Sequence, residues 1–400
     1  MKFIEKIKKV KIDLITYYKE DVGIAFESNG NLYYAKTMES EYWICIASKP
    51  TIAGFCGIDG NTIYFCTFPD GYRGKVINNF FDIEKKEVNL LHIEFPINGQ
   101  IRSLGLLKRN LFEIRTELEH KEYRSVLFNN LTNKWKLLEA DDRTGLSFIH
   151  DMNLFFPLGG KQCTLIAYNL NTFEPLWKTS LEPYSRYKEN LNDTVYNPGR
   201  LADFIGLFGN ELILLVTNQI LLAVDITTGV VTWSSEPMLN YDPESKFTFN
   251  PINQQYTWKE EHLAKINIQA IKESGVLHHG PLMFSSPFGA DTERGFIYFI
   301  SKYHLIEINI VTKATVVTNL AVMLPFPQVY GFNKMYFSKG LLYIALSLDA
   351  IMPSVLTVYN PVTKSFQFIH QFKITITDVL FFGDKFYIKS WKDDLYEFER

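Results

Sequence analysis

Short apolar runs of strand length recur along this chain, and each is followed by a polar residue, a turn and a second apolar run. The best copy reads Leu221-Leu222-Ala223-Val224-Asp225-Ile226-Thr227-Thr228-Gly229, with Trp233 a short distance further on. Asp and Asn side chains accept hydrogen bonds from backbone N–H groups two or three residues later, and Gly adopts a left-handed backbone without steric cost. The pattern therefore predicts a tight turn between two antiparallel strands.

Weaker copies of this turn share its offsets. They begin at Asp82, Asn129, Asn169, Asn309 and Asn360, and a degenerate first copy lies near Thr37 to Glu41. Lysines or Asn133 stand where Gly229 stands in the best copy, so these positions are expected to be left-handed. Most successive copies begin about 40 to 56 residues apart, which is close to the length of a four-stranded propeller blade.

A second set of turns would join the first and second strands of a blade. Its members are Asp59-Gly60-Asn61, Phe208-Gly209-Asn210, Lys339-Gly340 and Phe382-Gly383-Asp384. The last unit has only three strands, so the N-terminal segment Lys2 to Lys11 is expected to supply the fourth, with its lysines protecting an outer edge. Its apolar positions also fit a helix. We predict an all-β fold, a single β-propeller over residues 1–400 with eight four-stranded blades; seven is the alternative, because the first copy is poor.

The stretch Asp225-x-x-Thr228-Gly229-x-x-x-Trp233 resembles the repeat of PQQ-like (quinoprotein-type) β-propellers, and Asn169 to Trp177 is a partial second copy. The resemblance covers most of the chain as a pattern and implies the fold of that superfamily. Quinoprotein dehydrogenases are exported and bind a quinone and a calcium ion, whereas this chain shows no export signal, no adjacent cysteine pair and no matching calcium ligands. The resemblance therefore implies a non-enzymatic member without a cofactor.

Composition narrows the class of protein and its compartment. Aromatic residues make up 15% of the 400 residues, which suits strands, and 41 basic against 44 acidic residues argue against a nucleic-acid-binding protein. No apolar run is long enough to span a membrane, and lysines interrupt the N-terminus, so we expect a cytoplasmic protein without membrane contact. The four cysteines fit reduced, mostly buried thiols; a Cys56–Cys66 disulfide across a predicted hairpin is the alternative.

Motifs that carry catalysis do not occur in the sequence. It has no H-E-x-x-H, no G-x-S-x-G and no Walker loop, and its one histidine pair, His278-His279, would chelate a metal only in a loop. The carboxylates and arginine of 289–295 and 141–143 are expected in hydrophilic turns. We lean toward no enzymatic activity, no catalytic residues and no metal. An active site assembled from distant blades would leave no linear motif, so an enzyme stays open.

Two unusually long connections, 182–200 and 237–280, flank the fifth predicted blade on one face. They carry the candidate partner-binding residues Tyr184, Arg186, Tyr187, Tyr196, Arg200, Tyr241, Tyr256 and Trp258. Tyr, Trp and Arg are frequent anchors of protein interfaces. The alternative is that these aromatic residues attach the connections to the propeller. Within the second connection we expect a helix over about 258–274, or else an irregular strand over 265–270.

These features predict a monomeric, protein-binding propeller. The most specific form of the hypothesis is a bacterial immunity protein that binds and neutralises a toxin or effector. The alternatives are a hydrolase or lyase with its active site in the central funnel, and a sensor propeller for small molecules or glycans.

Overall fold

The computed structural model describes most of the chain. The residues outside the description are 1, 8–11, 49–52, 70–75, 94–99, 109, 118–122, 139–145, 159–162, 187–194, 242, 244–246, 251–254, 260–287, 302, 327, 328, 330, 349–352 and 392–394. The described residues form eight four-stranded antiparallel sheets and one two-stranded sheet. The predicted β-propeller of eight blades is confirmed. Its contacts divide into two compact units, which are described in turn.

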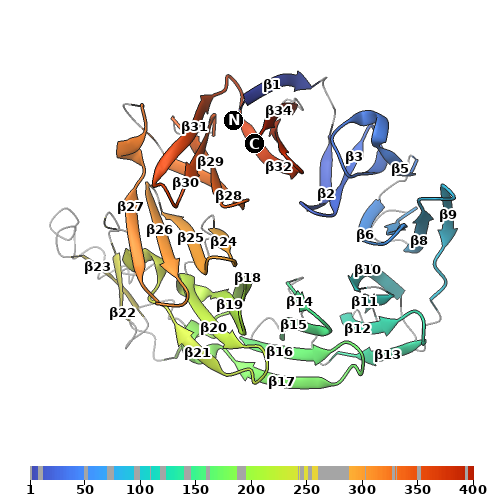
Figure 1. Ribbon diagram of the computed structural model, residues 1–400. Coiled ribbons are helices and arrows are strands. Elements are labelled where there is room, and N and C mark those ends of the chain that lie inside the picture. The colour runs from blue at the N-terminus through green and yellow to red at the C-terminus, as the bar shows by residue number, and fades with distance from the viewer. Residues whose placement is uncertain are drawn as a thin grey trace. The chain divides into compact units, whose positions relative to one another are not determined.

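Unit 1 comprises Met1–Asp142, Leu170–Phe173 and Ile376–Arg400. It contains four blades, which are blade 1 (β2 Leu14–Lys19, β3 Gly23–Ser28, β4 Asn31–Ala35, β5 Ile44–Ala47), blade 2 (β6 Ala53–Asp59, β7 Thr62–Thr67, β8 Ile77–Asp82, β9 Glu87–Leu90), blade 3 (β10 Gln100–Lys108, β11 Leu111–Glu117, β12 Tyr123–Asn129, β13 Lys134–Leu137) and blade 8 (β32 Ile376–Phe382, β33 Lys385–Ser390, β34 Leu395–Glu399, β1 Lys2–Ile7). Figure 1 shows their strands in blue and cyan, with β32 to β34 in red.

Unit 2 comprises Arg143–Asn169 and Glu174–Thr375. Its blades are blade 4 (β14 Phe148–His150, β15 Asn153–Leu158, β16 Thr164–Asn169, β17 Pro175–Ser180), blade 5 (β18 Leu201–Phe208, β19 Glu211–Val216, β20 Ile220–Asp225, β21 Val231–Ser234), blade 6 (β24 Phe288–Asp291, β25 Phe296–Ser301, β26 His304–Asn309, β27 Thr315–Asn319) and blade 7 (β28 Gly331–Ser338, β29 Leu341–Ser347, β30 Val355–Asn360, β31 Ser365–Gln371). The helical segments are short: α1 Glu182–Ser185 and the 3-10 turns Ser40–Tyr42, Thr217–Gln219, Met238–Tyr241 and Ala321–Met323.

Blade 8 is built from both ends of the chain, as predicted. Strand β1 pairs antiparallel with β34, and the register joins Lys2 to Glu399 and Ile7 to Leu395. The segment is therefore a strand rather than the alternative helix over residues 2–7. Its partner strand is well buried, since Leu395 and Phe398 are almost inaccessible to solvent.

The predicted turns between third and fourth strands have the expected chemistry. Asp225 Oδ1 accepts hydrogen bonds from the N–H groups of Thr227 and Thr228 at 3.0 and 2.8 Å, and from the Thr228 hydroxyl at 2.9 Å. Equivalent pairs of bonds occur at Asp82, Asn129, Asn309 and Asn360. The fourth residue after each of these five positions has a positive φ. The degenerate first copy differs, because a 3-10 turn over Ser40–Tyr42 replaces it.

This turn makes a testable prediction about pH. The hydrogen bonds from Thr228 and Thr227 favour the ionised form and lower the pKa of Asp225. Because the folded pKa lies below the unfolded value of about 3.9, the stabilisation is present above that value and is lost as pH falls through the folded pKa. We expect Asp225→Ala to cost on the order of 0.5–1 kcal/mol at pH 7, since the turn is exposed. Asp225→Asn should retain the turn, because Asn129, Asn309 and Asn360 make the same bonds in three other copies. The urea unfolding of this variant between pH 7 and 3 should be less sensitive to acid than that of the wild type. Unfolding curves of Asp225→Asn that keep the full wild-type pH dependence would contradict this explanation.

Within each unit, neighbouring blades pack through their middle strands. The second and third strands are buried on both faces, as in β19 and β20, whereas fourth strands such as β17 alternate between half-buried and exposed residues. Between blades 4 and 5, the indole N–H of Trp177 donates to the Ile226 carbonyl at 2.9 Å. A Cβ built on Gly229 would lie 2.6 Å from the Trp177 ring. The tryptophan of blade 4 therefore packs against the Asp–Thr–Gly turn of blade 5.

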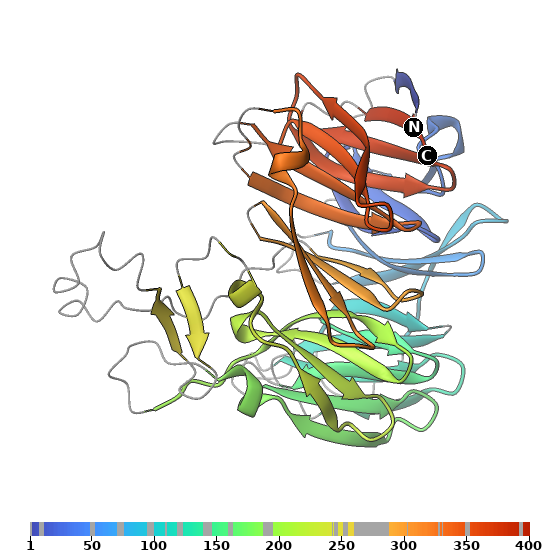
Figure 2. The ribbon, with the colours of Figure 1, turned by 60° about the vertical axis from the view of Figure 1, so that its left-hand side comes forward.

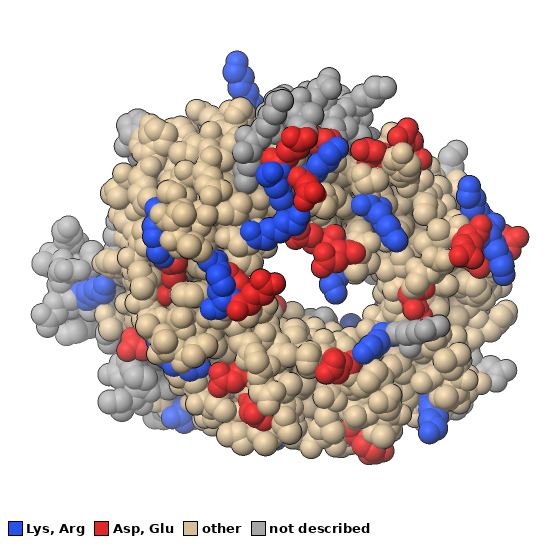
Figure 3. Space-filling view, viewed as in Figure 1, with Lys and Arg blue, Asp and Glu red and all other residues tan. Residues whose placement is uncertain are grey.

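Surface composition agrees with the near-neutral sequence. Figure 3 shows acidic and basic side chains mixed with one another on the face that it displays. None of the helices in the described residues is long and apolar enough to cross a membrane.

Candidate functional site

Two long connections of unit 2 flank blade 5 in the sequence, one before its first strand and one after its last. The first joins β17 to β18 and begins with α1, and the second joins β21 to β24 and contains a 3-10 turn at Met238–Tyr241. It also contains the hairpin of β22 (Phe247–Asn250) and β23 (Gln255–Trp258). Figure 2 shows this hairpin, in yellow, projecting from the blades of unit 2. In an up-and-down blade, connections between blades lie at the opposite end from the turns between third and fourth strands, here called the Asp–Thr turns.

The first connection is held at both of its ends. The Leu181 N–H donates to the Cys163 carbonyl at 2.6 Å, and the Ser185 hydroxyl donates to the Leu181 carbonyl at 2.9 Å. Gly199 packs against Ser185 so closely that an added Cβ would lie 1.9 Å from the Ser185 carbonyl oxygen. These contacts bring the start and the end of the connection together, so the residues beside them have fixed positions.

Three of the candidate residues lie around this junction. The Arg186 guanidinium lies 4.6 Å from the centre of the Tyr196 ring, a cation–π contact. The backbone of Arg200 is fixed by Thr217, whose hydroxyl accepts from the Arg200 N–H at 2.8 Å and whose own N–H donates to the Arg200 carbonyl at 3.0 Å. The Arg200 residue is nevertheless exposed. A fixed backbone with an exposed cationic side chain is a suitable arrangement for recognition, because little order must be gained on binding.

The remaining candidates divide into three kinds. Tyr184 and Tyr241 are half-buried and pack against the hydrophobic clusters of blade 5, which is the attachment role that the sequence left open. Tyr256 and Trp258 belong to β23, whose backbone pairing is the described feature. Tyr187 lies outside the described residues. Trp258 is in a strand, so the expected helix does not begin there, and the rest of 258–274, with the alternative strand at 265–270, falls on residues outside the description except residue 259.

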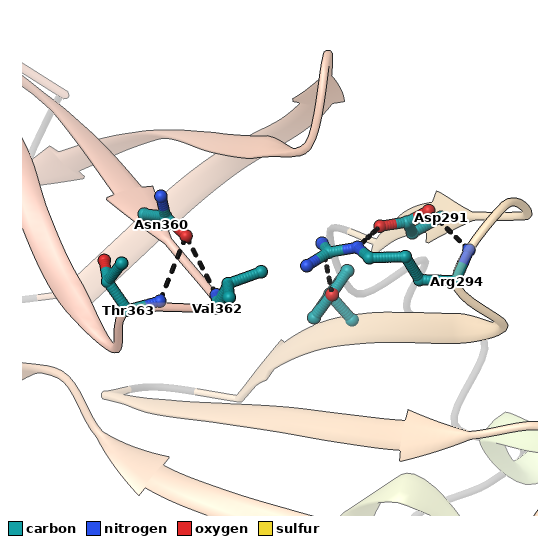
Figure 4. Close-up of polar contacts among 6 residues, drawn as sticks. Asp291, Arg294, Asn360, Val362 and Thr363 are labelled. Atoms are coloured by element: carbon teal, nitrogen blue, oxygen red, sulfur yellow. Dashed lines mark hydrogen bonds and ion pairs between the residues drawn. The ribbon is translucent and has the colours of Figure 1, made fainter.

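A second candidate site lies between blades 6 and 7, at the end of the blades that carries the Asp–Thr turns. A pocket of about 510 Å³ is lined by the β24–β25 hairpin, the Lys339–Leu341 turn, Phe337, Asn360 and Val362. Figure 4 shows the Arg294 side chain extending from the hairpin toward the turn of Asn360 to Thr363. The predicted hydrophilic hairpin at 289–295 is confirmed. Its polar side chains are not all solvated, because Asp291 and Arg294 pair with each other.

Arg294 is held by two partners in this pocket. Its Nε forms an ion pair with Asp291, which is almost fully buried, and its Nη2 donates to the Tyr298 hydroxyl at 3.2 Å. Burial raises the pKa of Tyr298, so this hydroxyl stays protonated. Nearby, Lys364 of blade 7 pairs with the buried Glu307 of blade 6. The Lys364–Glu307 pair joins the two blades, and Asp291 and Arg294 give the pocket a polar wall.

Sequence reasoning did not find Tyr298, Glu307 or Lys364 as partners in these contacts. Lys364 lies 57 residues after Glu307, Tyr298 lies opposite Glu307 on the neighbouring strand, and each is an ordinary strand or turn residue in isolation. One signal was available: Lys364 occupies the left-handed turn position, as Lys313 does one blade earlier. Lys313 likewise pairs with an acidic residue of the preceding blade, Glu211, at 3.2 Å. This repeated ion pair identifies the turn lysines as contacts between blades.

A third hollow lies in unit 1, between the outer parts of blades 1 and 2. It has a volume of about 590 Å³, and its walls include Phe65, Phe81, Asn79 and Lys86. The Asn79 amide donates to the Thr67 hydroxyl and to the Ile77 carbonyl. In the part of the chain that is described, no group of three or more His, Cys, Asp or Glu residues could hold a metal ion. The His278-His279 pair falls outside that part.

The fold defines the class of this protein, and comparison with known proteins agrees with it. No protein-family model matches the sequence, and no curated protein matches it. Among solved structures, the chain is similar to Saccharomyces cerevisiae Sqt1, with 9% identity, a TM-score of 0.55, and coverage of 99% of this chain and 97% of that one. It is similar to BamB from Moraxella catarrhalis, with 10% identity, a TM-score of 0.51, and coverage of 100% and 99%.

The C-terminal WD40 domain of Sif2 is a third similar structure, with 12% identity, a TM-score of 0.51, and coverage of 100% of this chain and 98% of that one. Identities this low show the fold alone. The chain is a β-propeller.

Proposed function

We propose that this chain is a non-enzymatic, protein-binding β-propeller of the PQQ-like repeat superfamily, and that its partner binds across the connections 182–200 and 237–280. The observation that carries the proposal is the junction of the first connection. There Ser185 and Gly199 fix the backbone, Arg186 stacks on Tyr196, and Arg200 is exposed on a backbone tied to Thr217. Arginine and aromatic side chains on a fixed backbone are typical of interface anchors.

The finer form of the proposal is a cytoplasmic bacterial immunity protein that binds and neutralises a toxin or effector. Propellers are common protein-interaction scaffolds, and the resemblance of Asp225 to Trp233 to PQQ-like repeats, without their catalytic residues, supports a member that acts by binding. Two long connections on one blade would offer a broad surface for a macromolecule.

The test co-expresses the full chain with the product of a neighbouring toxin-like reading frame, and measures complex formation and growth. We expect Arg200→Glu combined with Trp258→Ala to weaken binding by about tenfold or more, since the loss of even one interface anchor costs at least about 1.4 kcal/mol. The melting temperature should be nearly unchanged. Lys85→Glu, a charge reversal on an exposed Asp–Thr turn, is the matched control and should bind normally. Wild-type affinity in the double variant would reject this face as the interface.

The pocket between blades 6 and 7 favours a second candidate, a sensor of small molecules. Its volume of about 510 Å³ and its ion pair between the buried Asp291 and the half-buried Arg294 are features of ligand sites, which combine apolar walls with a few fixed polar groups. A small-molecule sensor would bind its ligand independently of Arg200 and Trp258.

A further inference from the structure

Two cysteine thiols meet on one face of blade 2, in unit 1. Strands β6 and β7 are antiparallel, and Cys66 lies opposite Gly54. The register shifts between Phe55 and Gly57, so Cys56 is the extra residue of a β-bulge. Both sulfur atoms approach the same acceptor, the Gly54 carbonyl oxygen, at 3.7 Å for Cys56 and 3.6 Å for Cys66.

The local sequence explains why the two sulfur atoms come together. Gly54 has no side chain, and a Cβ at that position would lie 3.2 Å from the Cys66 sulfur, so glycine leaves room for the thiol of Cys66. The bulge directs Cys56 to the same side of the sheet, where it contacts the cluster of Cys66, Phe68 and Val76. The two sulfur atoms therefore lie on the same side of the sheet, beside one carbonyl oxygen.

The surroundings suit reaction with a small oxidant. Cys56 is half-buried and Cys66 is 5% exposed, so the pair lies close beneath the surface of the blade. The hydrogen bond from the Cys56 thiol lowers the pKa of Cys66, and the same contact, with burial, raises the pKa of Cys56. The thiolate is the reactive form of cysteine, so the pair contains a nucleophile and a neighbouring thiol that can resolve its oxidised form. All four cysteines of the structure are free.

We propose that Cys56 and Cys66 form a reversible dithiol–disulfide site that reacts with peroxides. The Cys66 thiolate attacks one oxygen of hydrogen peroxide, the O–O bond breaks, and hydroxide leaves to become water. The resulting sulfenic acid is attacked by the Cys56 sulfur, which loses its proton, and the S–OH bond breaks to release a second water. Two thiols are oxidised by two electrons, one peroxide is reduced to two waters, and a thiol reductant reverses the reaction.

The disulfide would cross-link the neighbouring strands β6 and β7 of one hairpin. Cys45 is exposed on the outer strand of blade 1, and Cys163 is buried in unit 2. The site is independent of the proposed partner-binding connections, which belong to unit 2.

The first experiment uses the full chain with Cys45→Ser and Cys163→Ala, so that only the pair remains. After treatment with hydrogen peroxide under native conditions, we expect the intact mass to fall by two hydrogens and to return with dithiothreitol. The same protein carrying Cys56→Ser is the matched control, and it should gain oxygen instead, because the resolving thiol is gone. An oxygen adduct or an unchanged mass in the folded two-thiol protein would overturn the proposal.

A second measurement avoids dependence on the folding of variants. The wild-type chain is oxidised, its remaining thiols are alkylated, and it is digested with chymotrypsin, which cleaves at Tyr64 and Phe65 between the two cysteines. We expect a linked pair of peptides that contains Cys56 and Cys66 and separates on reduction. Alkylated Cys56 and Cys66 in the oxidised sample, or links to Cys45, would contradict the site.

Discussion

Removal of residues 1–11 is expected to destabilise the whole protein and to replace its cooperative unfolding with a broad, early transition. Strand β1 supplies the fourth strand of blade 8, and its ladder with β34 extends from Lys2–Glu399 to Ile7–Leu395. If each of the five paired positions of this ladder contributes about one backbone hydrogen bond worth about 0.5–1.5 kcal/mol net, the deletion removes on the order of 2.5–7.5 kcal/mol. This is a large part of a typical total stability of about 5–15 kcal/mol. Thermal and urea unfolding followed by circular dichroism measure the effect.

A peptide with the sequence of residues 1–11 provides the control for this deletion. Added to the truncated protein, it should pair with the free edge of β34 and raise the melting temperature in a concentration-dependent way. A scrambled peptide of the same composition should not. The truncated protein should also aggregate more readily, because an unpaired edge strand is a template for other chains. Unchanged cooperative unfolding after truncation would show that β1 does not contribute to the stability of blade 8.

Gly229→Ala is expected to be much more destabilising than Gly340→Ala. Both glycines have left-handed backbones, with φ of 74° and 78°. An added Cβ meets nothing within 4 Å at Gly340, but lies 2.6 Å from the Trp177 ring at Gly229. The left-handed conformation costs an L-residue about 1–2 kcal/mol at both sites, and the collision should add about 1–3 kcal/mol at Gly229 alone. Urea unfolding of the two variants measures the difference.

The double variant Trp177→Ala/Gly229→Ala identifies the cause of that difference. If the collision with the indole ring is responsible, removing the ring makes room for the new methyl group. The double variant should then lose less unfolding free energy than the two single variants lose together. Equal losses for Gly229→Ala and Gly340→Ala, or strict additivity in the double variant, would contradict the contact between the tryptophan and the turn.

Local chemistry allowed much of the fold to be predicted from sequence. An Asp or Asn that caps its own turn needs no distant partner, so the turns at Asp82, Asn129, Asp225, Asn309 and Asn360 could be recognised one by one. The turn after Asn169 shows the limit of this reasoning. Phe173 has a φ of 62° and is 4% exposed, which indicates that burial of its ring overrides the local preference for Gly, Asn or Lys.

Contacts between blades were less accessible to prediction. Tyr18 exchanges two hydrogen bonds with the backbone of Phe381, although the two residues are 363 positions apart in the sequence. The Glu307–Lys364 pair between blades 6 and 7 likewise depends on blade geometry that no single segment encodes. The β22–β23 hairpin is missing from the sequence prediction for another reason: Phe247, Phe249, Tyr256 and Trp258 alternate as in strands, but the possible capping pattern of Thr257 and Glu260 favours a helix from about 258.

The composite blade also has a consequence for folding during synthesis. Strand β1 leaves the ribosome early, but its partner β34 is made about 390 residues later, which at about 5–20 residues per second takes roughly 20–80 s. During that interval β1 has no native neighbour to pair with. Blade 8 is therefore the last blade that can form, and closing this chain-length contact carries the largest loop-closure entropy in the molecule. We expect the rate of productive folding to depend on this final strand pairing more than on any other blade.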